Sequence, residues 1–242
     1  MIFDPKYLLF VMLPTMALAF FAQWWVRSAF KQAAEIPNKQ RVTGAQAARY
    51  ILDRSGLASM RVEPTQPHGT GLNSGASPDL DDHYDPREKV LRLSPSVYSQ
   101  PSIAAVAVAA HEAGHAIQDA EGYTLMKART ALVPAANLGS NFGIFIVIIG
   151  FVIGSIQIAW LGVAAFSLGV LFALLTLPVE LNASSRALNL LTTSGLVDSQ
   201  ELPQAKTVLR AAAFTYVAGL AAALLNLLYW VSLVMGMGRS RD

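Results

Sequence analysis

The chain has 242 residues, of which 53% are hydrophobic and only 14% charged. Soluble domains carry about 25% charged residues, so this deficit favours a membrane protein. The net charge of +2 and the lack of any Lys/Arg run argue against nucleic acid as a partner. The chain has no cysteine, which excludes disulfides and limits a metal site to nitrogen and oxygen ligands.

The first apolar stretch covers residues 7–26 and contains no charged residue. It has about the length that a helix needs to cross the hydrocarbon core of a bilayer. Trp24 and Trp25 stand at its end, where aromatic side chains typically meet the interface. Residues 17–19 (Ala-Leu-Ala) resemble a signal-peptide cleavage site. Because the apolar stretch continues past them, we expect a retained transmembrane helix.

The next region, 27–135, begins with a short helix and a pair of strands. Thr43 and Gln46 form a capping-box pattern that predicts a helix to about Arg54, with Gly56 as its stop. The segments 60–63 and 90–94 flank a polar loop, 68–87, that is rich in Gly, Pro and Asp. We expect a small β-hairpin or ribbon with a long connection; a disordered loop is the alternative.

A second helix in this region is predicted from Ser102, its N-cap, to about Ala120. Alanine dominates it, and the apolar residues before His111 are too few to span a bilayer. The helix should therefore be buried inside the protein or lie against the membrane surface.

This helix carries the pattern His111-Glu112-Ala-Gly-His115, an H-E-x-x-H motif. Residues i and i+4 share one helix face, so the two imidazoles can hold one zinc ion at about 2.0–2.1 Å. Zinc lowers the pKa of a bound water toward about 7, and the Glu112 carboxylate can take its proton and pass it to a leaving amine. A chain of this composition would contain the pattern by chance roughly 0.002 times, so the motif is specific.

Two further apolar regions complete the predicted architecture. Residues 130–179 contain no charged side chain, which is enough for two spans within 137–178 and a turn near 155–160. A last span is expected at 211–238, after a polar segment at 179–210. The predicted fold is mainly α: a polytopic membrane protein with about four transmembrane helices and a zincin-like region carrying a small β-hairpin.

A catalytic zinc usually needs a third protein ligand. The candidates are His68, His83, Asp119, Glu121 and Glu180. Asp119 and Glu121 lie too far along the helix, whereas geometry leaves both histidines open. Glu180 ends fifty uncharged residues, and small residues at Ala183 and Gly114 would let two helices approach closely. The alternative is an interfacial carboxylate without a metal.

The charges also predict an orientation. The segment 27–135 holds twelve Lys/Arg residues, and 179–210 adds three more. Because positive residues favour the cytoplasmic side, both segments should face the cytoplasm, with both termini outside. The expected location is a bacterial inner (plasma) membrane, with the catalytic region on its cytoplasmic side.

Three stretches carry a family resemblance: AAHEAGHAIQ, HYDPREKVLRLS before it and PVELNASSRAL after it. With them the chain resembles the YugP-type family of neutral zinc metallopeptidases of bacterial membranes, over nearly its whole length. The layout is also similar to membrane zinc proteases of the gluzincin type. The resemblance implies Zn²⁺ as cofactor, His111, His115 and Glu180 as ligands, and Glu112 as general base.

The resemblance extends to residues around the ligands, with one departure. In gluzincin-type proteases an Asp commonly stands four residues after the ligand Glu and orients a ligand histidine. Here that position is Ser184, so this support is weaker or comes from elsewhere. Arg186, His83 and Tyr84 are the candidates for the donor that stabilises the transition state.

The function predicted from these features is a zinc endopeptidase that cuts membrane or membrane-proximal proteins at the cytoplasmic surface of the bilayer. The strand at 90–94 could bind an extended polypeptide substrate by edge pairing. The alternative is a non-proteolytic zinc-binding membrane scaffold; a homo-oligomer or a regulatory membrane partner stays open. A metal transporter is disfavoured because the spans lack repeated polar residues.

Overall fold

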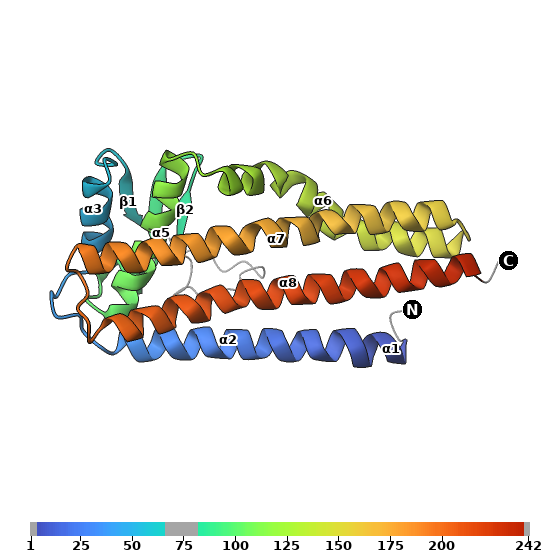
Figure 1. Cartoon of the computed structure of the whole chain (residues 1–242), viewed down its shortest axis with the longest axis horizontal. Coiled ribbons are helices and arrows are strands. Elements are labelled where there is room, and N and C mark those ends of the chain that lie inside the picture. The colour runs from blue at the N-terminus through green and yellow to red at the C-terminus, as the bar shows by residue number, and fades with distance from the viewer. Residues whose placement is uncertain (1–3, 66–81, 240–242) are drawn as a thin grey trace. The chain divides into compact units, whose positions relative to one another are not determined.

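The computed structural model describes residues 4–65 and 82–239 (Figure 1). Its contacts divide the chain into two compact units, each built from several segments. Unit 1 comprises Met1–Gln23, Thr124–Val179 and Phe214–Asp242, and unit 2 comprises Trp24–Tyr123 and Glu180–Ala213. Helices dominate both units, and one small sheet belongs to unit 2. The expected mainly α fold is thus confirmed.

Four helices in the described residues are long and apolar enough to cross a membrane: Pro5–Ala34, Thr124–Val152, Ile156–Thr193 and Leu202–Met237. The first consists of α1 (Pro5–Tyr7), the π-helical η1 (Leu8–Met12) and α2 (Leu13–Ala34). The others are α6 (Thr124–Val152), α7 (Ile156–Thr193) and α8 (Leu202–Arg239). Their number agrees with the prediction of about four transmembrane helices.

The turn between α6 and α7 lies slightly earlier than the sequence suggested, at residues 153–155 rather than 155–160. Gly154 has φ +71°, a left-handed conformation that ends α6. The Ser155 hydroxyl then accepts from the N–H of Ile158 at the start of α7. α7 continues without a break to Thr193, well past the end of the uncharged stretch.

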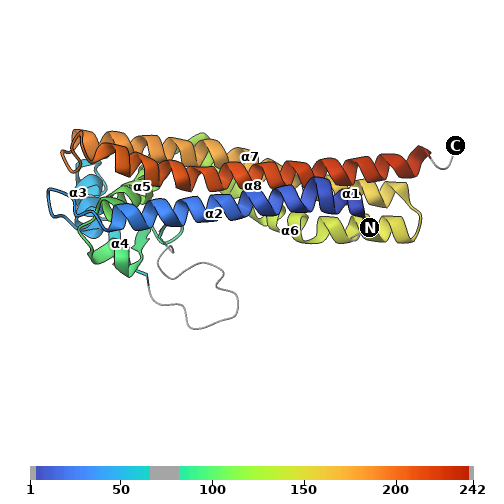
Figure 2. The ribbon, with the colours of Figure 1, turned by 90° about the horizontal axis from the view of Figure 1, so that it is seen from below.

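In unit 1, hydrogen bonds tie the start of the first helix to α8, and Figure 2 shows the two running side by side there. The Tyr7 hydroxyl donates to Oδ1 of Asn226 at 3.1 Å, and the Tyr229 hydroxyl donates to Oδ2 of Asp4 at 3.0 Å. Such polar contacts hold helices together where apolar burial gives little advantage over lipid. The first helix is therefore packed as a structural part of unit 1.

Glycines allow close packing of α6 against α7. A Cβ on Gly143 would lie 2.7 Å from the backbone nitrogen of Phe166, and one on Gly150 would lie 2.4 Å from that of Ala159. Only glycine fits such an approach of two backbones. α6 also contains Pro134, and Figure 1 shows this helix changing direction along its length.

The side chains of unit 1 are distributed as in a membrane protein. A small buried cluster joins α6, α7 and α8: Val147, Ala159, Val163, Trp230 and Val234. Large apolar side chains face outward, among them Phe20 at 77% exposure and Val152 at 81%. In water such a surface would be an aggregation risk, whereas lipid tails cover it without cost.

In unit 2, the predicted capping box opens α3 (Gly44–Arg54). Thr43 Oγ1 accepts from the N–H of Gln46, and Gln46 Oε1 accepts from the N–H of Thr43. Beyond the helix, Gly56 adopts φ +76°, as its role as a stop requires. Both ends of this helix were therefore readable from the sequence.

The sheet of unit 2 differs from the prediction. β1 (Arg61–Pro64) pairs in parallel with β3 (Val90–Leu93), while β2 (His83–Asp85) pairs antiparallel with β3. The two predicted strands do pair with each other, but in parallel, so their expected hairpin was wrong; the hairpin joins β2 to β3. The long segment after β1 allows the crossover that a parallel pair requires. Of the expected polar loop, 68–87, residues 68–81 lie outside the described residues.

This strand order also corrects the expected substrate-binding strand. β3 is the central strand, with β1 on one side and β2 on the other. Both of its edges are thus occupied, and edge pairing could take place only at an outer strand.

The predicted Ala-rich helix is α5 (Ile103–Ala120), and it follows the short α4 (Pro95–Ser99). The side chain of Ser102 accepts from the N–H of Ala105, which confirms it as the N-cap. Most residues of α5 are buried, and its small alanines allow close packing in unit 2. Of the two expected environments, burial inside the protein is the one observed.

Candidate metal centre

The two histidines of the motif lie one turn apart on α5, as their spacing requires. Their ring centroids are 4.8 Å apart and the rings are nearly perpendicular. α7 brings Glu180 to the same place: its Oε2 lies 3.2 Å from Nε2 of His111 and 3.3 Å from Nε2 of His115. One carboxylate oxygen thus faces both imidazole nitrogens. All three residues belong to unit 2.

A close crossing of α5 and α7 makes this convergence possible. A Cβ on Gly114 would lie 3.0 Å from the carbonyl oxygen of Ala183 and 3.5 Å from its Cα. A larger residue at Gly114 would require the backbone at Ala183 to move by a few tenths of an ångström. The small residues noted in the sequence at this crossing therefore bring the ligand candidates together.

The three residues His111, His115 and Glu180 could hold a metal ion, since their ligand atoms all lie within 4.8 Å of one another. Ligands at about 2.0–2.1 Å around a tetrahedral zinc ion are about 3.3–3.4 Å apart. The two nitrogen-to-oxygen distances of 3.2 and 3.3 Å match this edge length. Two imidazoles and one carboxylate are also the donor set of a zinc site with an open fourth position.

The site is buried and its groups interact strongly. Glu180 is 2% exposed and His115 is 7% exposed. Burial by itself would lower the pKa of His115, but its hydrogen bond to Glu180 and the nearby carboxylates of Glu112 and Glu180 outweigh this and raise that pKa. The carboxylates thus favour positive charge at this position, which suits the binding of a cation.

The outer ring nitrogen of each histidine has its own partner. Nδ1 of His111 lies 3.2 Å from Oγ of Ser184, and Nδ1 of His115 lies 2.9 Å from Oε1 of Gln118. Ser184 thus occupies the place that the resemblance assigns to an orienting residue. Sequence reasoning missed Gln118, although its position three residues after His115 puts it on the same helix face.

The carboxylate of Glu112 accepts a hydrogen bond from the backbone of the sheet. The backbone N–H of Tyr84, in β2, donates to Oε2 of Glu112 at 3.0 Å. The Tyr84 hydroxyl donates to Oδ2 of Asp119 at 2.7 Å, and Lys89 forms an ion pair with the same carboxylate. Burial and the bond to Asp119 raise the pKa of the Tyr84 hydroxyl. Tyr84 therefore contacts the motif through its backbone, while its hydroxyl binds Asp119.

The other sequence candidates lie elsewhere in unit 2. Arg186, a candidate transition-state donor, forms an ion pair with Glu121 at 2.7 Å, and among the described residues Glu121 is not part of the ligand group. His83 lies in β2 opposite Arg92. Among the described residues, the group able to hold a metal contains neither His83 nor Asp119. His68 lies outside the described residues.

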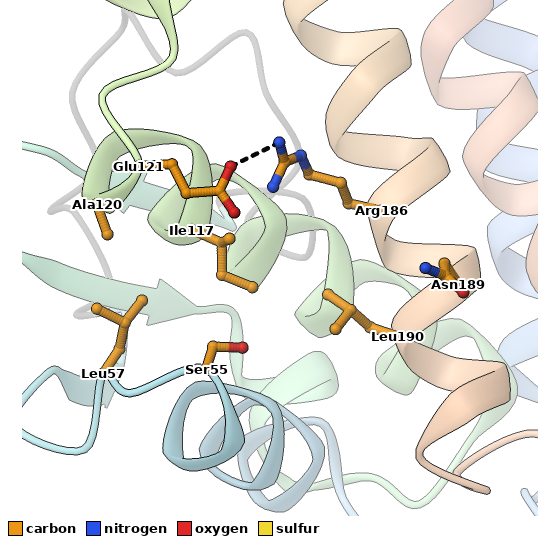
Figure 3. A pocket seen from close by; sticks show the side chains of 8 residues that line it. All are labelled: Ser55, Leu57, Ile117, Ala120, Glu121, Arg186, Asn189 and Leu190. Carbon is orange, nitrogen blue, oxygen red and sulfur yellow. Dashed lines mark ion pairs between the residues drawn. The ribbon is translucent and has the colours of Figure 1, made fainter.

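A cavity of about 470 Å³ lies beside the ends of α5 and α7. Figure 3 shows Arg186 reaching from α7 to Glu121 at its wall, with aliphatic side chains opposite. Its lining residues are Ser55, Leu57, Ile117, Ala120, Glu121, Arg186, Asn189 and Leu190.

The helices and the site define the class to which the chain belongs: membrane-associated proteins with an H-E-x-x-H helix and a buried group able to hold a metal. A family model described as "Putative neutral zinc metallopeptidase" matches residues 8–235, and the chain belongs to this family. The family implies Zn²⁺ as the cofactor.

A curated relative points the same way. The chain is 39% identical over 234 residues to "Putative membrane protease YugP" of Bacillus subtilis (strain 168), covering 97% of this chain and 99% of that protein. No solved structure matches the chain.

Proposed function

We propose that this protein is a membrane-embedded zinc endopeptidase of the gluzincin type that hydrolyses peptide bonds of membrane or membrane-proximal proteins. The observation that carries the proposal is the convergence of His111, His115 and Glu180 on one point, with Glu112 next to His111 on the same helix. The family match and the relative's name support the class of reaction.

In this proposal His111, His115 and Glu180 hold zinc. When bound, zinc would act as a Lewis acid that activates a water and polarises the peptide carbonyl. Glu112 accepts the proton of the attacking water and returns it to the nitrogen of the leaving amine. The Tyr84 N–H fixes the direction of the Glu112 carboxylate, so little reorganisation is needed for these transfers.

Substrate binding would involve the sheet. Since β3 is central, an extended polypeptide would pair with β2, the outer strand whose Tyr84 contacts Glu112. The cut bond would then lie close to the general base. The substrates are expected to be chains near the bilayer, because Glu180 directly follows the apolar part of α7 in the sequence.

The test compares Glu112→Gln with the unchanged protein. The variant should still bind about one zinc per chain and should lose proteolysis, because an amide cannot accept the proton. Zinc content would be measured by elemental analysis, and cleavage by proteomics of membrane peptides. A zinc-loaded Glu112→Gln with full activity would exclude the mechanism, and a zinc-loaded protein that cleaves nothing would favour the scaffold.

We also propose that unit 2 faces the cytoplasm of a bacterial inner membrane. Most of the basic residues outside the apolar spans belong to unit 2. A cytoplasmic reporter fused after residue 200 should be active, and a periplasmic reporter should be active at the C-terminus. The reverse pattern would place the catalytic region outside.

A further inference from the structure

We infer that Gln118 is a positioning residue that selects the metal-binding tautomer of His115. Arg186, acting through Asn182, sets the orientation of the Gln118 side-chain amide. This inference deepens the proposed function, since it concerns the same site. It rests on a chain of hydrogen bonds whose donors and acceptors can be assigned from one end.

The assignment starts at Arg186, because a guanidinium has only donors. Its Nε–H donates to Oδ1 of Asn182 at 2.8 Å. The amide of Asn182 must therefore present its oxygen, rather than its nitrogen, on this side. A flipped Asn182 amide would place its NH₂ group against the N–H of Arg186, so that two donors would face each other.

The same oxygen of Asn182 then determines how Gln118 is oriented. Nε2 of Gln118 donates to Oδ1 of Asn182 at 2.8 Å. With its nitrogen used in this way, Gln118 presents Oε1 to Nδ1 of His115, at 2.9 Å. Gln118 is completely buried, so a wrong orientation would leave unmatched donors without water to satisfy them.

An acceptor at Nδ1 requires that His115 carry its proton there. The other nitrogen, Nε2, would then have its lone pair available for a metal ion held between it and Glu180. Gln118 in the opposite orientation would favour the tautomer protonated on Nε2, which cannot bind a metal through that atom. This series of hydrogen bonds thus favours the tautomer of His115 that can bind a metal through Nε2. The group that contacts Nδ1 is a neutral amide, so no further charge is placed next to the histidine.

The series of hydrogen bonds begins at Arg186, which lies at the cavity wall and forms an ion pair with Glu121 (Figure 3). The Glu121 side chain is 53% exposed, so this ion pair is screened by solvent. The hydrogen bond from Arg186 to Asn182, and not the ion pair with Glu121, determines which groups donate and which accept along this series. This distinction provides a matched control.

The experiment measures zinc affinity by chelator competition in purified variants. Gln118→Leu should weaken zinc binding about 10–100-fold, the usual cost of losing the partner of a ligand histidine. Asn182→Leu should weaken it by a smaller factor. Asn182→Asp should bind within about twofold of the unchanged protein, because its oxygen still accepts from both Gln118 and Arg186. Glu121→Gln, the control, should also leave the affinity unchanged.

A second measurement follows the Nδ1 proton rather than zinc affinity. In ¹⁵N spectra of the zinc-loaded protein with labelled histidines, His115 should carry its proton on Nδ1, with the downfield shift of a proton bonded to Gln118. Gln118→Leu should remove that downfield shift. Unchanged affinity and an unchanged Nδ1 proton shift in Gln118→Leu, or an Asn182→Asp as weak as Asn182→Leu, would overturn the inference. Either result would leave the proposed protease intact, whereas an active Glu112→Gln would reject the protease and leave the Nδ1 result standing.

Discussion

Small residues let helices approach closely in both units, at Gly150 against Ala159 in unit 1 and at Gly114 against Ala183 in unit 2. In unit 1 the neighbouring side chains are apolar, and the approach produces packing alone. In unit 2 the residues flanking the crossing are His111, His115 and Glu180, and the same approach brings ligand atoms together. The difference shows that a close crossing supplies proximity, while the side chains beside it decide whether it becomes a site.

The largest effect is expected from removing the carboxylate that α7 contributes to the crossing in unit 2. Glu180→Ala should lower zinc affinity more than about tenfold and abolish activity, because two imidazoles remain as ligands. Glu180→Asp should keep part of the affinity, since a shorter side chain still offers an oxygen. Zinc content and chelator competition would measure both.

A buried glutamate outside the site offers the matched control. Glu201 is 6% exposed, and its carboxylate accepts from the N–H groups of Lys39 and Asp198. Glu201→Ala should lower the thermal stability of the protein but keep its zinc. Equal zinc loss in Glu201→Ala and Glu180→Ala would mean that the Glu180 effect is general unfolding.

A smaller effect is expected when a methyl group is added at each crossing. Gly150→Ala should destabilise the protein by about 1–3 kcal/mol through overpacking, with zinc affinity unchanged. Gly114→Ala should lower zinc affinity about fivefold, equivalent to about 1 kcal/mol, because α7 must shift away from α5. Thermal unfolding in detergent and chelator competition separate the two outcomes.

The control for this pair is Gly219→Ala in α8, where a Cβ would meet nothing within 4 Å. This change should be neutral or stabilise by up to about 1 kcal/mol, since alanine favours helices. If Gly114→Ala and Gly150→Ala lowered zinc affinity equally, the distinction drawn between the two crossings would fail.

The smallest effect is expected from a polar contact in unit 1. Tyr7→Phe removes the hydrogen bond to Asn226. Bonds between membrane helices contribute about 0.6 kcal/mol on average, so stability should fall by roughly that amount, and zinc affinity should not change. Thermal unfolding and zinc competition on one preparation would check both. A loss of zinc in Tyr7→Phe would contradict the expectation that the site in unit 2 does not depend on this hydrogen bond.

Local patterns predicted much of what the structure contains. The capping box at Thr43 and the N-cap at Ser102 depend on residues close in sequence, and both are where the sequence placed them. The number of long apolar helices also agrees with the prediction. The strands illustrate the limit. Their positions near 60–63 and 90–94 were readable, but their parallel pairing was not, because alternation along a strand does not reveal its partner.

The candidate site divides in the same way. The sequence by itself determined that His111 and His115 share a helix face, since four residues are one helical turn. Glu180, sixty-five residues beyond His115, stays a predicted ligand, and only the crossing at Gly114 places it 3.3 Å from that histidine. Gln118 gained a role only through Asn182 and Arg186 on another helix. Helical periodicity fixes neighbours within one helix, whereas contacts between helices depend on packing that only the tertiary structure decides.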